Sequence, residues 1–145
     1  MLRKNSLRLR EWNYALPGPY FFTICTQKHK DLFYRADIRN TVINVFRWTL
    51  IKLETKLHTL VVATDHIHGI LSLPEGNKLN LAQVIGSAKV KTTQTLKERY
   101  QMCERIWQRS YYDHVMRDEK DFIQKAKYIE NHPLKEKGNQ YAEWH

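Results

Sequence analysis

The sequence predicts an α+β domain with a central antiparallel sheet, because strand-like and helix-like segments follow one another in a specific order. Segments rich in β-branched and aromatic residues alternate with longer segments whose apolar residues recur every three or four positions. One long helical pattern lies between the first two strand patterns and another between the third and fourth, as in a ferredoxin-like split βαβ fold. The composition, 42% hydrophobic and 27% charged, is that of one folded domain over residues 1–145. In the split βαβ pattern, the two long helices are expected on one face of the sheet.

Each element is placed by its composition and by the residues at its ends. The expected strands are residues 20–27, 58–63, 66–73 and 106–112, and the expected helices are residues 37–57, 81–99 and 118–132. Asp37 and Asn80 are expected to cap the first two helices, and Pro133 ends the third. A basic N-terminal arm, residues 1–19, precedes the first strand, and residues 138–145 are expected to form a loose tail.

The chain is strongly basic, which favours a polyanionic partner. Its formal net charge is +9 at pH 7 and its sequence pI is about 9.6. No apolar run is long enough to span a membrane, and no apolar stretch of a signal peptide follows the basic N-terminus. We therefore expect a cytoplasmic, nucleoid-associated protein without membrane contact, in which Cys25 and Cys103 are free thiols. On charge alone, a basic protein without an anionic partner is the alternative.

Basic residues gather in two parts of the sequence, and aromatic residues lie among or just after the second group. Lys and Arg bind phosphates regardless of base sequence, and aromatic rings stack on unpaired bases, so this mixture favours single-stranded nucleic acid. The residues expected to contact DNA are Arg3, Lys4, Arg8, Arg10, Lys89, Lys91, Trp107, Arg109 and Arg117. For Trp107, a strand-edge packing contact is an equally good interpretation, and Arg109 and Arg117 could be ordinary surface charges.

Two histidines one residue apart, His66 and His68, are the main candidates for a metal site. Residues i and i+2 of a strand point to the same face, with Cα atoms about 6.5 to 7 Å apart. Two imidazoles at this spacing can bind one cation. Ile67, Leu71 and Leu73 then point to the helices, so the histidines are expected on the other, open face rather than in the core. A solvent-facing pair without a ligand is the alternative interpretation.

The third predicted helix carries a second group of candidates. Tyr128 and His132 are four residues apart and share one helix face. His132 could complete a three-histidine site on the open sheet face, and Asn131 is a less well-spaced alternative. On spacing alone, a core tyrosine is the favoured interpretation of Tyr128, and His132 could equally be a cap at the helix C-terminus.

Four segments of the sequence carry a family resemblance when taken together. They are YFFTICTQ (residues 20–27), DHIHGIL (65–71), IWQRSYYDHVMRDEKDF (106–122) and KYIENHPLK (127–135). In this order and spacing the chain resembles the IS200-like, single-tyrosine transposases, and within them the REP-associated tyrosine transposases. The resemblance spans most of the chain, so it is more specific than an isolated pair of histidines.

The resemblance implies a site and an activity. Family members bind the metal, usually Mg²⁺ or Mn²⁺, through two histidines that flank a hydrophobic residue, here His66, Ile67 and His68. Their nucleophile is a tyrosine on the last helix, which matches Tyr128, so this catalytic helix is expected on the sheet face opposite the other two helices. They cleave single-stranded DNA beside hairpins, leaving a 5′-phosphotyrosine and a free 3′-hydroxyl, and they work as monomers or as homodimers.

The sequence departs from the family pattern at two positions. His132 stands where relatives typically carry another polar ligand, often Asn or Gln, and three nitrogen ligands bind ions softer than Mg²⁺ more tightly. Asp65 stands where relatives commonly carry Asn, and we interpret it as a turn residue or as a group that supports the first histidine.

Three functions are compatible with these patterns. The leading one is a metal-dependent transposase and nickase that rejoins strands without ATP, because the phosphotyrosine conserves the bond energy. The second is a hairpin-DNA-binding module without catalysis, and the third is a metal-dependent nuclease that uses water. Tyr111 and Tyr112 are rival nucleophiles, interpreted here as packing or base-stacking residues, and His114 is a weaker rival ligand.

Overall fold

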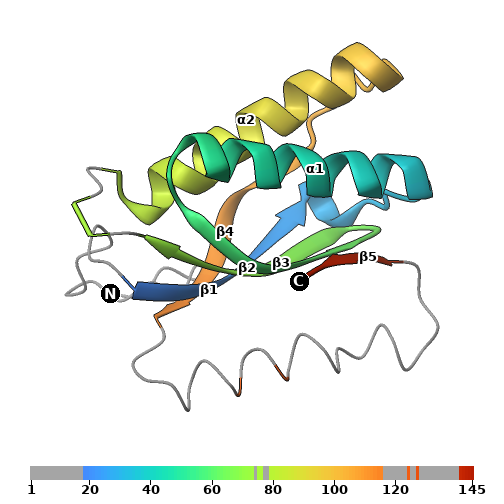
Figure 1. The fold of residues 1–145 in the computed structure, drawn as a ribbon. Helices are drawn as coiled ribbons and strands as arrows, with labels where there is room; N and C mark the ends of the chain where they lie inside the picture. Colours follow the sequence, from blue (N-terminus) through green and yellow to red (C-terminus); the bar gives the residue numbers. More distant parts are fainter. Residues whose placement is uncertain (1–17, 74, 77–78, 116–123, 125–126, 128–140) are drawn as a thin grey trace.

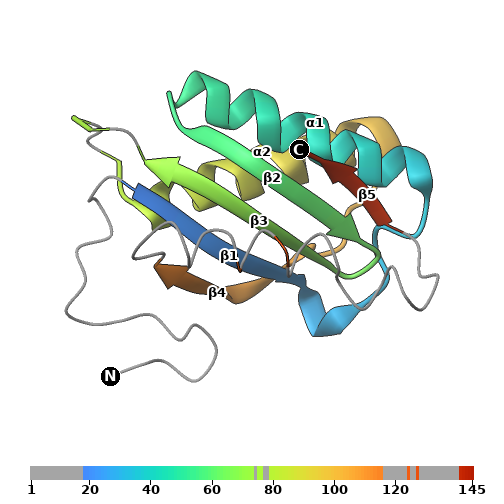
Figure 2. The same cartoon turned by 60° about the horizontal axis from the view of Figure 1, so that its bottom comes forward.

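The fold is a five-stranded antiparallel sheet with two helices on one face (Figure 1). The computed structural model describes residues 18–73, 75–76, 79–115, 124, 127 and 141–145. In chain order the elements are β1 (Gly18–Thr26), the 3-10 helix η1 (Gln27–His29), α1 (Ala36–Lys52), β2 (Lys56–Ala63), β3 (His66–Leu73), α2 (Leu81–Tyr100), β4 (Trp107–Val115) and β5 (Tyr141–Trp144). The strand order in the sheet is β4-β1-β3-β2-β5 (Figure 2). The first four strands therefore have the predicted split βαβ arrangement, and the α+β prediction is confirmed.

The helices pack on the sheet through one continuous core. Alternate residues of the strands point into it, as a pleated strand requires, and they meet the apolar stripes of α1 and α2. The largest side chains that are fully buried include Tyr20, Phe22, Phe33, Phe46 and Leu50. Neither α1 nor α2, the two long helices described, is long and apolar enough to cross a membrane.

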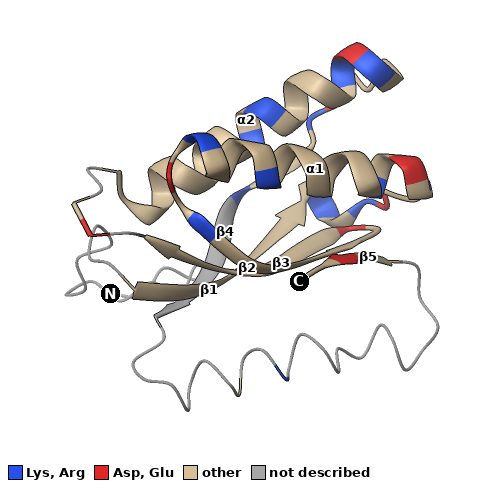
Figure 3. Ribbon diagram, viewed as in Figure 1, with Lys and Arg blue, Asp and Glu red and all other residues tan. Residues whose placement is uncertain are grey.

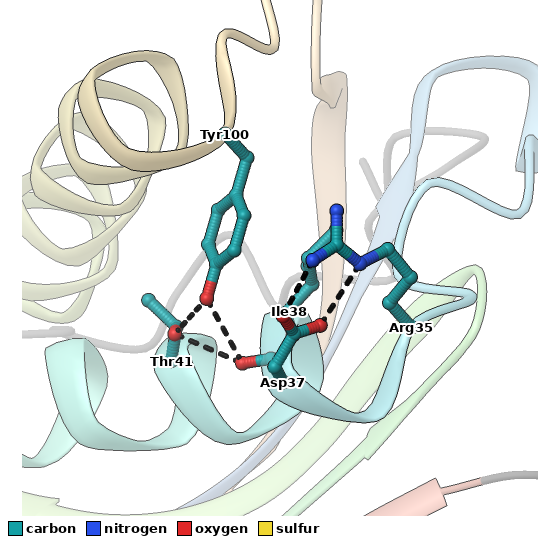
Figure 4. Close-up of polar contacts among 5 residues, drawn as sticks. All are labelled: Arg35, Asp37, Ile38, Thr41 and Tyr100. Atoms are coloured by element: carbon teal, nitrogen blue, oxygen red, sulfur yellow. Dashed lines mark hydrogen bonds and ion pairs between the residues drawn. The ribbon is translucent and has the colours of Figure 1, made fainter.

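The start of α1 differs from the prediction by two residues. Arg35 occupies the N-cap position, and Asp37 lies inside the first turn, where its carboxylate accepts a hydrogen bond from the Ile38 backbone N–H (2.9 Å). The Arg35 guanidinium donates to the same carboxylate at 2.6 Å and holds the pKa of Asp37 below its ordinary value. The Tyr100 hydroxyl, at the end of α2, lies 2.8 Å from Thr41 Oγ1, so the two helices run antiparallel (Figure 4).

The prediction of α1 to residue 57 is wrong at its C-terminal end. The helix ends at Lys52, and Glu54 adopts a left-handed backbone conformation with φ 55°. Leu57 continues the four-residue apolar spacing in the sequence, but it lies on β2 and is buried there. A strand residue that points into the core can extend a helical pattern by coincidence, which is why periodicity missed this boundary.

The second helix begins where the sequence predicts. The Asn80 side chain accepts a hydrogen bond from the Gln83 backbone N–H (2.9 Å), and the Gln83 side chain accepts one from the Asn80 N–H (2.8 Å). This capping box satisfies two backbone donors that the first helical turn leaves unpaired. The prediction of Asn80 as N-cap is confirmed.

The prediction of a loose tail over residues 138–145 is wrong for residues 141–144, which form β5. This strand pairs with the edge of β2, with Leu60 opposite Trp144 and Ala63 opposite Tyr141. The Thr59 hydroxyl donates to the Trp144 carbonyl (3.2 Å), and the Arg47 guanidinium lies 4.8 Å from the Trp144 ring centroid. A four-residue strand is too short to show a recognisable alternation in the sequence. It forms here because the edge of β2 offers backbone N–H and C=O groups with which it can pair.

Two other predicted segments are described only in part. In the predicted helix over residues 118–132, Gln124 and Lys127 are helical and exposed, and the remainder lies outside the described residues. In the predicted basic arm, Gly18 and Pro19 belong to β1, and residues 1–17 lie outside the described residues. The arm and the third helix therefore stay predictions.

Gly69 marks a point where the sheet leaves no space for a side chain. It is paired with Phe22 on β1 and Leu60 on β2, and a Cβ at this position would lie 2.4 Å from Phe22 Cζ. Because the Phe22 ring is fully buried, it cannot move aside freely. We expect Gly69→Ala to lower the free energy of unfolding by about 1–3 kcal/mol, the usual cost of overpacking, measured by urea denaturation.

The matched control for Gly69→Ala is Gly86→Ala on α2. A Cβ at Gly86 meets no atom within 4 Å, and alanine favours the helix by about 0.5–1 kcal/mol. The two Gly→Ala substitutions should therefore shift the urea midpoint in opposite directions. Equal stability of Gly69→Ala and the parent protein would contradict the packing described here.

Candidate functional site

His66 and His68 share one face of β3, the sheet face away from the helices. β3 is the central strand of the sheet (Figure 2). Ile67 and Leu71, at alternate positions, belong to the core beneath α1 and α2, so the two histidines share the opposite face, as predicted. Their ring centroids are 4.6 Å apart, with an angle of 74° between the ring planes. The two imidazoles are thus close enough to act on one ligand.

His68 is held by a residue of the neighbouring strand. Thr23 on β1 is its register partner, and Thr23 Oγ1 lies 2.9 Å from His68 Nδ1. The Phe21 ring stacks on the imidazole, with centroids 6.0 Å apart and planes 24° apart. Thr23 was not singled out from the sequence, although pairing the first and third strands of the split βαβ pattern would have placed it on the histidine face.

His66 is held by the residue before it. Its Nδ1 lies 2.6 Å from an oxygen of the Asp65 carboxylate, which can only accept, so Nδ1 carries the hydrogen. The Asp65 carbonyl accepts hydrogen bonds from the Thr26 N–H (2.9 Å) and hydroxyl (3.0 Å), which fix the β2–β3 turn against β1. The interpretation of Asp65 as a group that supports the first histidine therefore agrees with the geometry.

The histidine face of the sheet is more enclosed than the sequence predicts. His68 is only 6% exposed, and Phe21, Val61 and Ile70 on the same face are also buried. His68 is therefore not exposed on an open face as expected, and the Phe21 ring stacked on it covers part of its surface. The side chain of His66 keeps 17% of its surface exposed.

The donor set suits a divalent cation. Histidines that bind metals usually have their second ring nitrogen held by a carboxylate, hydroxyl or carbonyl group, as both of these rings do. Within the described residues, no group of three or more His, Cys, Asp or Glu side chains could hold a metal ion. His66 and His68 by themselves would leave a cation in need of further ligands. The predicted contributors His132, Asn131 and Tyr128 lie outside the described residues.

Cys25 is a thiol on β1 that is paired with His66 in the sheet register. Burial raises the pKa of the Cys25 thiol, and the negative charge of Asp65 raises it further. The thiol is therefore neutral at physiological pH, and a neutral thiol is a poor nucleophile and a poor metal ligand.

The prediction that Trp107 contacts DNA is wrong. The side chain is 8% exposed and packs edge-on against Phe33 (5.6 Å) and Phe46 (6.4 Å), while its indole N–H donates to the Lys89 carbonyl (3.0 Å). A ring enclosed in this way cannot stack on a base. The packing interpretation holds instead, because Trp107 ties the start of β4 to α2.

The other predicted DNA contacts differ in their surroundings. The Lys89 ammonium group donates to the Gln108 carbonyl (3.2 Å), and burial, with a smaller effect of the Arg105 charge, lowers the pKa of Lys89. Lys91 and Arg109 are exposed. The remaining candidates, Arg3, Lys4, Arg8, Arg10 and Arg117, lie outside the described residues.

The rival residues Tyr111, Tyr112 and His114 all belong to β4, whose backbone pairs with β1. In the register, Tyr112 is opposite Thr23 and His114 is opposite Phe21. Their side chains lie outside the described part of the structure, so their roles stay predictions.

The fold and the histidine pair can now be compared with known proteins. The family model described as "Transposase IS200 like" matches residues 19–132. The chain belongs to this family. The IS200-like family match covers both described histidines and the segment that holds Tyr128 and His132, so the predicted family resemblance is confirmed.

Two relatives match most of this IS200-like chain. It is 30% identical over 162 residues to an uncharacterized protein of Haemophilus influenzae, covering 90% of this chain and 88% of that protein. It is 25% identical over 128 residues to the REP-associated tyrosine transposase of Escherichia coli K12, covering 84% and 70% of the two chains.

A solved structure has the same fold as this IS200-like chain. It is described as the REP-associated tyrosine transposase bound to a REP hairpin, and it superposes with a TM-score of 0.71. The superposition covers 89% of this chain and 74% of that chain at 21% sequence identity. At this identity the likeness establishes the fold, and the ligand of that protein is a starting point for a proposal.

Proposed function

We propose that this protein is a metal-dependent transposase that cleaves and rejoins single-stranded DNA beside hairpins, with Tyr128 as its nucleophile. The observation that carries the proposal is the geometry of His66 and His68, whose rings are 4.6 Å apart and whose Nδ1 atoms are both held by neighbouring side chains. Two imidazoles oriented in this way, in a chain of the IS200-like transposase family, support a metal-assisted reaction at DNA.

The cation would be bound by His66 and His68 through Nε2, together with His132. Because Nδ1 is engaged by Asp65 or Thr23, we assign Nε2 of each ring to the cation. A divalent ion bound there supplies Lewis-acid stabilisation of the scissile phosphate. Mg²⁺ and Mn²⁺ are the expected ions, and a third imidazole shifts the preference toward Mn²⁺.

Tyr128 would perform the covalent step. Its phenolic oxygen forms a bond to the phosphorus, and the bond between phosphorus and the 3′-oxygen breaks. The proton of the phenol ends on the 3′-oxygen, which leaves as a free hydroxyl, while the 5′-phosphate stays attached to the tyrosine. The reverse reaction with another 3′-hydroxyl rejoins two strands, and no water is consumed in either direction.

Hairpin DNA is the proposed substrate because a protein of the same fold is described as bound to a REP hairpin. The basic character of this chain, with a net charge of +9, suits such a partner. Exposed Lys91 and Arg109 are available for phosphate contacts.

The test is incubation with Mn²⁺ and a labelled hairpin oligonucleotide that has single-stranded flanks. A covalent adduct that survives denaturing electrophoresis, with the DNA mapped to Tyr128 by mass spectrometry, is the expected result. Released product without an adduct would replace the proposal with a nuclease that uses water. Binding without any cleavage would replace it with a hairpin-binding module.

Thr23 offers a test of how the metal site is built. Thr23→Val removes the hydroxyl that lies 2.9 Å from His68 Nδ1 and keeps the shape of the side chain. Loss of such a supporting group typically weakens metal binding by about 10–100-fold. We therefore expect Mn²⁺ affinity, measured by electron paramagnetic resonance, to fall at least about tenfold.

Two variants control this measurement. Thr23→Ser restores the hydroxyl and should restore Mn²⁺ affinity. Ser72→Ala removes a hydroxyl that lies 2.7 Å from the ring of another histidine, His58, and should leave Mn²⁺ affinity unchanged. Parent-like Mn²⁺ affinity in Thr23→Val would remove the supporting role of this residue.

A further inference from the structure

We propose that the groove between α1 and α2 binds a segment of single-stranded DNA, on the opposite side of the sheet from the histidine pair. This inference rests on the proposed function, because it adds a second contact for the same DNA. The groove has a volume of about 1020 Å³, and residues from both helices line it. We call it the α1–α2 groove, and the lining residues that matter here are Trp48, Lys52, Gly86, Val90, Lys91 and Arg99.

The helical repeat aligns these residues along the groove. Trp48 and Lys52 are four residues apart on α1, and Gly86 and Val90 are four residues apart on α2. Residues with this spacing share one helix face. The two antiparallel helices thus present an aromatic ring and positive charges along the α1–α2 groove.

Exposed apolar surface indicates that the groove has a ligand. Trp48 is 63% exposed and Val90 is 59% exposed, although both are large apolar side chains. An exposed tryptophan ring provides a flat surface on which an unpaired base can stack. The bases of a duplex are stacked inside it, so this ring favours a single strand.

The charges of the groove select a polyanion. Lys52, Lys91 and Arg99 line it, with no Asp or Glu among its described lining residues. Figure 3 shows Lys and Arg positions in blue on both α1 and α2. Positive charge that follows a groove suits a phosphate backbone. A second copy of the chain would bring the same three cations together, so like-charge repulsion disfavours self-association through this face.

Gly86 allows the groove to be blocked without damage to the fold. A Cβ at Gly86 meets no atom within 4 Å, so a side chain there would project into open space. Glutamate is also a better helix former than glycine. Gly86→Glu should therefore fold normally while it places a negative charge in the α1–α2 groove.

The experiment measures binding of fluorescein-labelled oligothymidylate, which forms no hairpin, by fluorescence anisotropy in EDTA. We expect Trp48→Ala and Gly86→Glu each to weaken binding about tenfold, the scale of losing one stacked base. Lys91→Ala should also reduce the slope of log affinity against log salt by about 0.7, the value for one phosphate contact on a single strand.

Matched controls lie on the same helices outside the groove lining. Ile51→Ala removes another exposed apolar side chain of α1 (58% exposed), and Asn40→Glu adds the same charge as Gly86→Glu at an exposed position. Lys97→Ala removes an exposed α2 cation. The first two controls should bind oligothymidylate like the parent protein, and Lys97→Ala should keep the parent salt slope.

Two results would overturn the inference. One is parent-like oligothymidylate affinity in both Trp48→Ala and Gly86→Glu. The other is a dimer in sedimentation that Gly86→Glu converts to a monomer with unchanged DNA affinity, which would make the groove a contact between copies. EDTA prevents metal-dependent cleavage, so the anisotropy measurement tests only DNA binding in the α1–α2 groove. The proposed function is tested separately by the covalent adduct, so the two hypotheses can fail independently.

Discussion

Tyr128→Phe is expected to abolish the covalent protein–DNA adduct while hairpin binding persists. The substitution removes only the phenolic oxygen, which is the atom that would bond to phosphorus, and it keeps the ring. Removing the nucleophile of an enzyme that works by covalent catalysis costs many orders of magnitude in rate, so we expect a loss of at least about 10³-fold. Denaturing electrophoresis measures the adduct, and a gel shift in EDTA measures binding.

Two tyrosines of β4 provide the matched controls for Tyr128→Phe. Tyr111→Phe and Tyr112→Phe make the same chemical change at the rival nucleophiles, and both variants should still form the adduct. An adduct that persisted in Tyr128→Phe and vanished in one of these variants would move the nucleophile to β4. Loss of the adduct in all three variants would point to folding, which circular dichroism checks.

His68→Ala is expected to produce the second-largest effect, the loss of metal binding and of metal-dependent cleavage. The imidazole is buried and lies 2.9 Å from the Thr23 hydroxyl, and it is one of the two histidine ligands proposed for the cation. A Lewis acid contributes several kcal/mol of transition-state stabilisation, so we expect adduct formation to slow by at least about 100-fold. Mn²⁺ titration followed by electron paramagnetic resonance measures the loss of binding directly.

The control for His68→Ala is a histidine of the same sheet outside the site. His58 on β2 is also partly buried, and its Nε2 is hydrogen-bonded to Ser72 (2.7 Å), so His58→Ala reproduces the loss of one such ring. It should keep both Mn²⁺ affinity and adduct formation. EDTA should slow adduct formation by the parent protein as much as the His68→Ala substitution does. It should not slow adduct formation by the His68→Ala variant any further. Mn²⁺ binding that survived in His68→Ala would exclude this residue as a ligand.

The sequence predicted well where a signal is local. The bounds of β3 follow from the alternation that starts at His66 and stops before Pro74, and the start of α2 follows from Asn80 and its partner Gln83. Each depends on residues within a few positions of one another, which is the range that strand alternation and helix capping describe. The order of strand and helix patterns then restricted the topology to the split βαβ arrangement.

The predictions that were wrong depend on distant contacts. The four residues of β5 form a strand because the edge of β2 accepts them, and Trp107 is buried because Phe33 and Phe46 enclose it. Neither partner is near in sequence. A segment that contains an aromatic residue among basic residues has the same composition whether the aromatic ring stacks on a base or fills the core. Composition alone therefore could not separate these two roles.

The sequence by itself determined the family, the fold class and the shared face of His66 and His68, because the period of a strand places alternate residues together. Only the tertiary structure decided that Thr23 and Asp65 hold the two rings, that His68 is shielded, and that α1 and α2 leave a basic groove between them. These features arise where separate elements meet, and their distances depend on how the sheet and helices pack.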